Sequence, residues 1–482
     1  MKKKFYIALG CGLAFILLNC IALKYEFLYV PFFSAVAIVL YLLLSRVDLL
    51  LYLMALVTPF SIEFADTKIN IGLSIPAEII MVLITILFFV RLLYDVRLHR
   101  KIIFHPISIL IYIYLTWMLT TSITSEMPLV SFKFLASKIW FITACYFCVI
   151  QLIKNDFKKI ITFINCYAFS LGVVIMITTI KTVLAGFPKQ GMHWIMSPFY
   201  NDHTAYGAAI AFFIPLVVAL FIIDGKTTWK KVYYLLLMAV LFTGLILSYC
   251  RAAWLSILVA FFIYVVIKLR IKFSWIFVGV ALLGTTLYFF SDDILYRMSR
   301  NSQDSSTEFM EHIISVSNIK TDASNVERLN RWNSAFGMIE DRPVFGWGPG
   351  TYQFEYAGYQ KGKYKTIIST NFGTGGNAHS EYIGPCAEMG FPGALIVILL
   401  MITVIYTGIK AYAKASDKIY KNLSLFAVIA LISYYIHGIM NNFLDTDKLS
   451  LPFWMAFAII VVVDVLSKNE NLKIYNTNEA IL

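Results

Sequence analysis

Runs of about 20 consecutive apolar residues recur along this chain, and they constrain its fold more than any other feature. A helix of that length crosses the hydrocarbon core of a bilayer. Of the 482 residues, 60% are hydrophobic and only 14% are charged, against about 45–50% and about 25% in soluble domains. The sequence therefore predicts an all-α bundle of membrane-spanning helices and excludes a soluble enzyme.

About 12–14 spans are expected from the lengths of these runs. The candidate helices are 5–23, 27–45, 47–60, 75–95, 105–124, 133–153, 158–180, 203–223, 231–249, 252–268, 273–290, 391–411, 421–441 and 450–466. The run 47–60 is short and could be a half-helix. The first run follows three lysines but lacks a clear cleavage site, so we interpret it as a retained helix rather than a signal peptide.

The positive charge follows the predicted loops. The net charge is +12, which in a soluble protein would suggest nucleic-acid binding. Here, with both termini in the cytoplasm, more than half of the Lys and Arg residues fall in short loops on one side, as the positive-inside rule requires. We therefore expect a multi-pass protein of the bacterial inner membrane, with membrane lipids and no nucleic acid as partners.

One polar segment is far longer than an ordinary connection. Residues 291–390 separate two groups of apolar runs and fall on the outer, periplasmic side by the same alternation. The chain is thus expected to comprise membrane helices in 1–290, a large and partly helical periplasmic loop in 291–390, and membrane helices with a cytoplasmic tail in 391–482. Cys145 and Cys148 lie inside an apolar run, so we interpret them as packing residues rather than a redox or metal pair.

Polar residues gather at the predicted outer ends of the helices. Asn201, Asp202 and His203 stand at the start of the run 203–223. Asn201 or Asp202 could simply cap that helix. The alternative is that these three side chains face a site and bind sugar.

Arg251 lies between two apolar runs with almost no polar linker around it. A positive charge at the outer interface is costly and runs against the positive-inside bias. The side chain could extend to lipid headgroups. It could instead form an anion site, because a guanidinium matches phosphate oxygens two at a time.

A second basic feature lies in the long loop. Apolar residues at helical spacing predict a helix after Ser324, ending near Asp341 and followed by the glycine-rich turn 346–350. Arg328 and Arg331 are three residues apart and share one side of this helix. They could be solvated arginines of an interfacial helix, or they could bind an anion.

The end of the long loop carries a histidine. Asn377, His379 and Ser380 follow two glycines, and Ser380 could cap a helix that leads into the next span. A histidine near a helix N-terminus is favoured in its neutral form, which is what a general base needs. A lone histidine can equally be structural.

Taken together, these segments resemble the O-antigen ligase family, with its relatives the O-antigen polymerases and bacterial O-oligosaccharyltransferases. His379-Ser380, then nine residues, Gly390, two residues and Gly393 match the family pattern H-[N/S/Q]-x9-G-x-x-[G/T/Y]. Arg251-x-x-x-Leu255 matches its R-x-x-x-L element. Arg328-x-x-x-Trp332 and the glycine turn match its arginine helix. The usual span count in the family is about twelve.

The resemblance implies a GT-C-like membrane fold and a reaction at the periplasmic face. A glycan on undecaprenyl diphosphate would be transferred to a sugar hydroxyl of the lipid A-core, with inversion and without a metal or cofactor. Arg251 and Arg328 would stabilise the diphosphate leaving group, and His379 would take the proton from the acceptor hydroxyl. Arg331, Asn201, Asp202, His203, Asn377 and Ser380 would bind substrate.

Two alternatives stay open at this stage. The same donor chemistry could serve a growing glycan, as in a polymerase, or a protein Ser/Thr hydroxyl. A polysaccharide transporter or flippase is the more distant alternative, although a transporter would be expected to carry ionisable residues near the membrane midplane.

Overall fold

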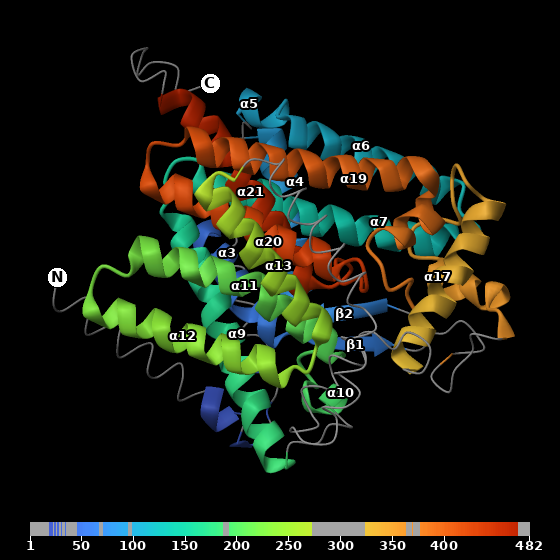
Figure 1. The fold of residues 1–482 in the computed structure, drawn as a ribbon, viewed down its shortest axis with the longest axis horizontal. Helices are drawn as coiled ribbons and strands as arrows, with labels where there is room; N and C mark the ends of the chain where they lie inside the picture. Colours follow the sequence, from blue (N-terminus) through green and yellow to red (C-terminus); the bar gives the residue numbers. More distant parts are fainter. Residues whose placement is uncertain are drawn as a thin grey trace, which may run out of the picture.

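The computed structural model describes residues 46–66, 71–94, 99–186, 192–271, 323–362 and 376–470, with Ser369 and a few residues between 19 and 34. Helices dominate these residues, and the one sheet among them is a two-stranded hairpin (Figure 1). The predicted spans 5–23, 27–45 and 273–290 lie wholly or largely outside the described residues. The same is true of 291–322 in the long loop.

The amino-terminal half contains, in order, α3 (Val47–Val57), the 3-10 turn η1 (Thr58–Phe60), β1 (Ile62–Asp66), β2 (Ile71–Ile75), α4 (Ala77–Tyr94), α5 (Arg100–Ile103), α6 (Pro106–Ile123), α7 (Pro128–Ile142), the π-helical turn η2 (Thr143–Phe147), α8 (Cys148–Ile153) and α9 (Lys159–Leu184). The elements α7, η2 and α8 are consecutive and form one long helix. The two strands pair antiparallel, with Ile62 opposite Ile75. The sequence did not predict this hairpin.

The remaining elements are α10 (Met192–Ile195), α11 (His203–Asp224), α12 (Thr228–Leu247), α13 (Arg251–Leu269), α17 (Ala323–Asp341), α18 (Tyr352–Glu355), the 3-10 turn η3 (Tyr356–Tyr359), α19 (Ile383–Lys414), α20 (Lys418–His437) and α21 (Asp447–Glu470). Side chains cap several of these helices. Asp417, for example, accepts a hydrogen bond from the backbone of Ile419 at 2.6 Å and so begins α20.

Nine helices in the described part of the chain are long and apolar enough to cross a membrane. They agree closely with the predicted runs, which confirms an all-α polytopic membrane protein. The predicted run 47–60 forms the shorter apolar helix Val47–Phe60. The helix predicted at 391–411 is longer in the structure. It begins at Ile383 and continues through a kink at Gly390.

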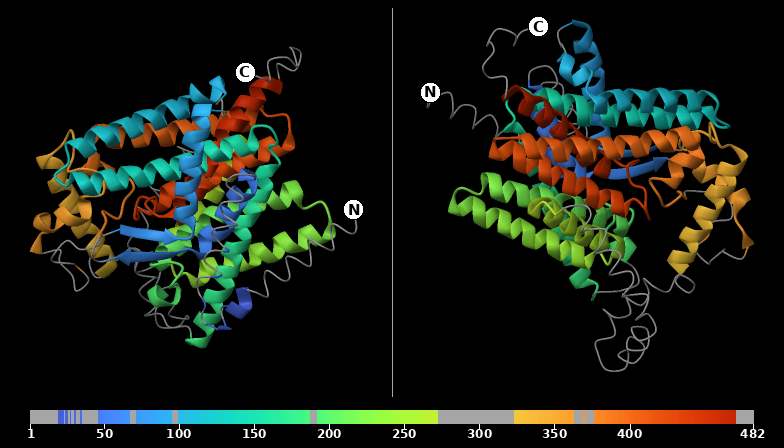
Figure 2. Two further views of the ribbon diagram at one scale, coloured as in Figure 1. Left: turned by 180° about the vertical axis from the view of Figure 1, so that it is seen from behind. Right: turned by 45° about the horizontal axis from the view of Figure 1, so that its top comes forward.

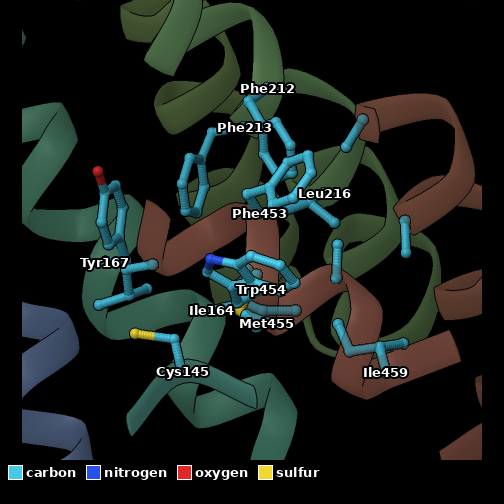
Figure 3. Packing of buried hydrophobic residues seen from close by; sticks show 14 of the residues in the cluster. Cys145, Ile164, Tyr167, Phe212, Phe213, Leu216, Phe453, Trp454, Met455 and Ile459 are labelled. Carbon is cyan, nitrogen blue, oxygen red and sulfur yellow. The ribbon is translucent and has the colours of Figure 1, made fainter. Parts of the chain in front are cut away.

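Central and peripheral helices differ in burial. In the most apolar stretch of each helix, 89% of residues are buried in α21 and 83% in α11, against 17% in α13. Figure 3 shows the centre, where Tyr167 of α9 stacks on Phe213 of α11 at 4.3 Å between ring centroids and Trp454 of α21 packs nearby. Cys145 lies in the same core. Cys145 and Cys148 are both buried free thiols, as the packing interpretation predicted.

The bundle has two distinct ends. His105, before α6, and Asp464, near the end of α21, meet at 3.3 Å between Nε2 and Oδ2, which marks one end. At the other end, α17 lies beyond the ends of α6, α7 and α19 in both views of Figure 2. The loop between α20 and α21 also reaches α17 there, where the carbonyl of Met440 accepts from Arg328. The predicted outer segments therefore converge at one end of the molecule.

Candidate active site

The two arginines of α17 have different surroundings. Arg331 is buried and its Nε donates to Glu327 Oε1 at 2.6 Å, while its guanidinium lies 4.3 Å from the ring centre of Tyr356. Arg328 is half-buried and its Nε donates to the carbonyl of Met440 at 3.3 Å. The sequence predicted that both would face one site, but only Arg328 reaches out to the opposing loop. Arg331 is held in a buried ion pair.

Gly376 explains how Arg331 fits. A Cβ atom at this position would lie 1.4 Å from Nη1 of Arg331. Arg331 Nη1 also lies 3.5 Å from the carbonyl oxygen of Asn377, to which it donates. The glycine before the histidine turn is thus required by the close approach of the buried guanidinium.

His379 sits in a tight turn that its neighbours shape. Asn377 Oδ1 accepts from the His379 N–H at 3.1 Å, and Ser380 Oγ accepts from the backbone of Ile383 at 3.4 Å. His379 itself has a φ of +49°, a left-handed conformation that is uncommon for a residue with a side chain. Ser380 Oγ therefore accepts from the backbone at the start of α19, and Asn377 Oδ1 stabilises the turn before it.

Burial, together with the positive charges of Arg328 and Arg331, lowers the pKa of His379 to about 4, while Asp202 acts in the opposite direction. The imidazole is therefore neutral near pH 7. The sequence predicted a neutral histidine from the helix dipole. In the structure the larger causes are desolvation and the two arginines.

The segment before α11 caps that helix. Asp202 Oδ1 accepts from the Thr204 N–H at 3.1 Å, and it also lies 2.8 Å from Nδ1 of His203. The side-chain amide of Asn201 donates to Glu63 of the hairpin. The helix-cap interpretation therefore describes Asp202, although its charge also acts on His379. Asn201 turns toward the hairpin instead.

Arg251 is the first residue of α13 and is half-buried. The neighbouring Cys250 lies close to the same charges: burial raises the pKa of its thiol to about 11, with Asp202 raising it and Arg328 lowering it. Gly207 lets α13 approach α11, since a Cβ there would lie 2.9 Å from Cβ of Cys250. Arg251 is thereby brought to the end of the bundle that carries Arg328 and His379.

The glycines of the family pattern have structural reasons. Gly390 has a φ of +69°, and a Cβ atom on it would lie 2.0 Å from the carbonyl oxygen of Val344. Gly346, Gly348 and Gly350 also have positive φ, and Gly348 donates to the carbonyl of Glu388 at 2.8 Å. The glycine turn is thus fastened to the first part of α19.

The sequence did not single out Glu381, whose side chain holds the loop between α20 and α21 in place. Its buried carboxylate Oε1 accepts from the Tyr434 hydroxyl at 2.5 Å, from the Phe443 N–H at 2.8 Å and from the Leu444 N–H at 3.0 Å. Burial raises the pKa of this carboxyl. Lys138 holds the other side of the loop by donating to the carbonyl of Leu444 at 2.7 Å and to Asp445 at 2.8 Å.

His437 is another buried residue that the sequence did not mark. It ends α20, is only 1% exposed and lies 3.3 Å from the Asn441 side chain. Its position inside a predicted apolar run gave no signal that it would reach the site. Among the described residues, no group of three or more His, Cys, Asp and Glu side chains is placed to hold a metal ion.

Fold and site together define a multi-pass α-helical membrane protein with arginines and a neutral histidine gathered at one end, an arrangement suited to an anionic substrate. A family model described as O-antigen ligase matches residues 236–398, the stretch that contains Arg251, Arg328 and His379. Over these residues the chain is similar to the O-antigen ligase family.

The chain is also similar to an uncharacterized protein of Haemophilus influenzae. The two are 23% identical over 135 residues, which cover 28% of this chain and 33% of that protein. The chain thus matches about a third of that relative's length.

Proposed function

We propose that this protein is an O-antigen ligase of the bacterial inner membrane. It transfers a glycan from undecaprenyl diphosphate to a sugar hydroxyl of the lipid A-core at the periplasmic face, with inversion and without a metal. The observation that carries this proposal is that His379 lies at the same end of the bundle as the two arginines of α17, whose positive charges help to lower its pKa.

The arginines supply the charge that the reaction needs. Breaking the bond between the anomeric carbon and the diphosphate builds negative charge on the leaving oxygen, and a positioned guanidinium stabilises it. Arg328 and Arg251 take this role. Arg331 forms an ion pair with Glu327. Its positive charge acts on His379, and its guanidinium packs against the turn at Gly376.

His379 acts as the general base. Its pKa of about 4 in the structure leaves the ring neutral and able to accept a proton at physiological pH. The arrival of a diphosphate opposes the field of Arg328 and Arg331, so the pKa of His379 rises as the donor binds. The acceptor hydroxyl then loses its proton to the imidazole as its oxygen attacks the anomeric carbon.

The acceptor is tested by competition. Purified protein in proteoliposomes is given one undecaprenyl-diphosphate glycan and three acceptors: lipid A-core, a second lipid-linked glycan and a Ser/Thr peptide. The proposal predicts that glycan appears on lipid A-core. Transfer only to the second glycan would make the protein a polymerase, and transfer only to the peptide would make it a protein glycosyltransferase.

A further inference from the structure

A short exposed apolar segment joins α17 to the glycine turn. Val344 is 51% exposed and Phe345 is 44% exposed, and Pro343 is exposed beside them. We call residues 343–345 the apolar elbow. A single exposed apolar side chain is ordinary on a protein surface, so the significance of the elbow depends on what surrounds it.

The elbow is fastened to two membrane-spanning helices. The ring of Phe345 stacks on Trp117 of α6, with centroids 5.7 Å apart and an interplanar angle of 15°. The carbonyl of Pro343 accepts from the Phe391 N–H of α19 at 2.8 Å. Trp117 in turn donates to the carbonyl of Met389 at 2.9 Å. The elbow therefore contacts α6 and α19 near the ends of these helices that lie beside α17 (Figure 2).

An exposed apolar stripe leads from α19 to the elbow. Phe391 is 59% exposed, Leu395 56%, Ile398 40% and Ile402 58%. Their spacing of four, three and four residues puts them on one face of the helix. Because α19 is a membrane-spanning helix, its exposed apolar face contacts lipid, and Phe391 is the member of the stripe next to the elbow.

Arg342, the residue before the elbow, has partners of its own. Arg342 forms an ion pair with Glu126, and its guanidinium lies 4.5 Å from the ring centre of Trp347. Aromatic rings beside a basic side chain are typical of the membrane–water interface. When the elbow enters lipid, Arg342 therefore keeps Glu126 and Trp347 as partners at the membrane surface.

We propose that the apolar elbow inserts into the adjacent leaflet of the bilayer, where its occupant is phospholipid acyl chain. The elbow begins two residues after Asp341, the last residue of α17. Its insertion fixes the carboxyl end of α17 at the membrane surface. This inference rests on the membrane-spanning fold and is independent of the proposed reaction.

The experiment is photo-crosslinking in proteoliposomes of phosphatidylethanolamine and phosphatidylglycerol that carry a radioactive phosphate. A benzophenone amino acid replaces Val344 in one variant. It replaces Leu395, on the lipid-facing stripe, in the positive control, and Glu340, an exposed residue of α17, in the matched negative control. We expect phospholipid adducts at 344 at a yield close to that at 395, with 340 at background.

An adduct yield at position 344 equal to that at 340, with strong labelling at 395, would overturn the proposal. A crosslink from 344 to a second copy of the chain would do the same, because the elbow would then be a protein interface. Thiol labelling gives an independent measurement. Val344→Cys in liposomes should react at least about tenfold more slowly with a charged maleimide than Glu340→Cys, and equal rates would contradict insertion.

Discussion

The carboxylate of Glu381 accepts the backbone N–H of Leu444 at 3.0 Å, so the residue two positions after His379 fixes the loop between α20 and α21. The same loop presents the carbonyl of Met440 to Arg328. Lys138 also stabilises this loop, because its ammonium group donates to the Leu444 carbonyl. The loop between α20 and α21 therefore contacts both Arg328 and the segment that carries His379.

This relationship predicts the effect of replacing Glu381. Glu381→Ala leaves the N–H of Leu444 without its acceptor and leaves the N–H of Phe443 only the Tyr434 hydroxyl, at 3.1 Å. An N–H group that loses its acceptor costs about 1–3 kcal/mol. We expect a lower melting temperature and weaker donor binding. Glu381→Gln keeps a carbonyl acceptor and should recover much of both. Thermal unfolding and donor titration of the two variants measure this, and an Ala variant that binds donor normally would contradict it.

Replacing Arg328 and replacing Arg331 should have different effects, one on the transfer rate and the other on stability. Arg328→Ala should lower the transfer rate about 10²–10³-fold, the scale for losing one charge-stabilising donor, with little change in melting temperature. Arg328→Lys should restore little, because an ammonium cannot replace the bidentate fork. Near-normal transfer by the Ala variant would remove the phosphate-site role.

Arg331→Ala should instead destabilise the protein, by about 3–5 kcal/mol, because Glu327 is left as a buried unpaired charge. The double variant Arg331→Met with Glu327→Gln should regain most of the lost stability. Unfolding curves in detergent check both variants. A stable Arg331→Ala protein would show that the buried ion pair does not hold α17.

Gly376 offers a test of the same packing. Gly376→Ala places a methyl group 1.4 Å from the Arg331 guanidinium and should reduce both stability and transfer. Gly358→Ala is the matched control, since nothing lies within 4 Å of its added Cβ. Equal behaviour of the two variants in unfolding and transfer assays would contradict the described contact.

Much of this architecture could be predicted from the sequence. The nine described spans follow from hydropathy alone, and the end of α17 at Asp341 follows from its apolar spacing and Pro343. Arg251 could be predicted because a charge between two apolar runs is conspicuous, and Arg328 and His379 because a helical pattern and a pair of glycines mark their segments of the long loop. Glu381 escaped notice because its role depends on backbone N–H groups some 60 residues away, which no local pattern records.

The differing roles of Arg328 and Arg331 could not be predicted either. Their three-residue spacing puts them on one side of a helix, but the choice of partner depends on tertiary packing. Arg331 meets Glu327 and Tyr356 inside the fold, whereas Arg328 meets a loop that is distant in sequence. The hairpin was missed for a similar reason, since its strands are short and lie in a loop between spans.

The orientation in the membrane can be measured at described positions. Glu340→Cys, at the end of the bundle with His379, should react in cells with a membrane-impermeant thiol reagent once the outer membrane is permeable. Ser416→Cys, in the exposed connection between α19 and α20, is the matched control and should react only after the inner membrane is lysed. The reverse pattern would place the site in the cytoplasm.

The pH dependence of transfer should report His379. The base is active when neutral, so activity is present above its pKa and is lost as pH falls through it. Because burial and the arginines hold the pKa at about 4 in the free protein, kcat/KM should stay flat through about pH 6.5, the ordinary imidazole value. The acid limb of kcat should lie higher, because bound diphosphate offsets the arginines. A kcat/KM limb at the ordinary value would contradict this environment.

The most direct measurement of the central claim is a single-turnover assay that follows both products at once. Proteoliposomes receive undecaprenyl-diphosphate glycan and lipid A-core, and mass spectrometry quantifies glycosylated acceptor and released undecaprenyl diphosphate. We predict equal amounts of the two, with the rate reduced about 10²–10⁴-fold in His379→Ala and donor affinity little changed. Intact donor moved across the bilayer, with no diphosphate released, would instead identify a transporter and contradict the account.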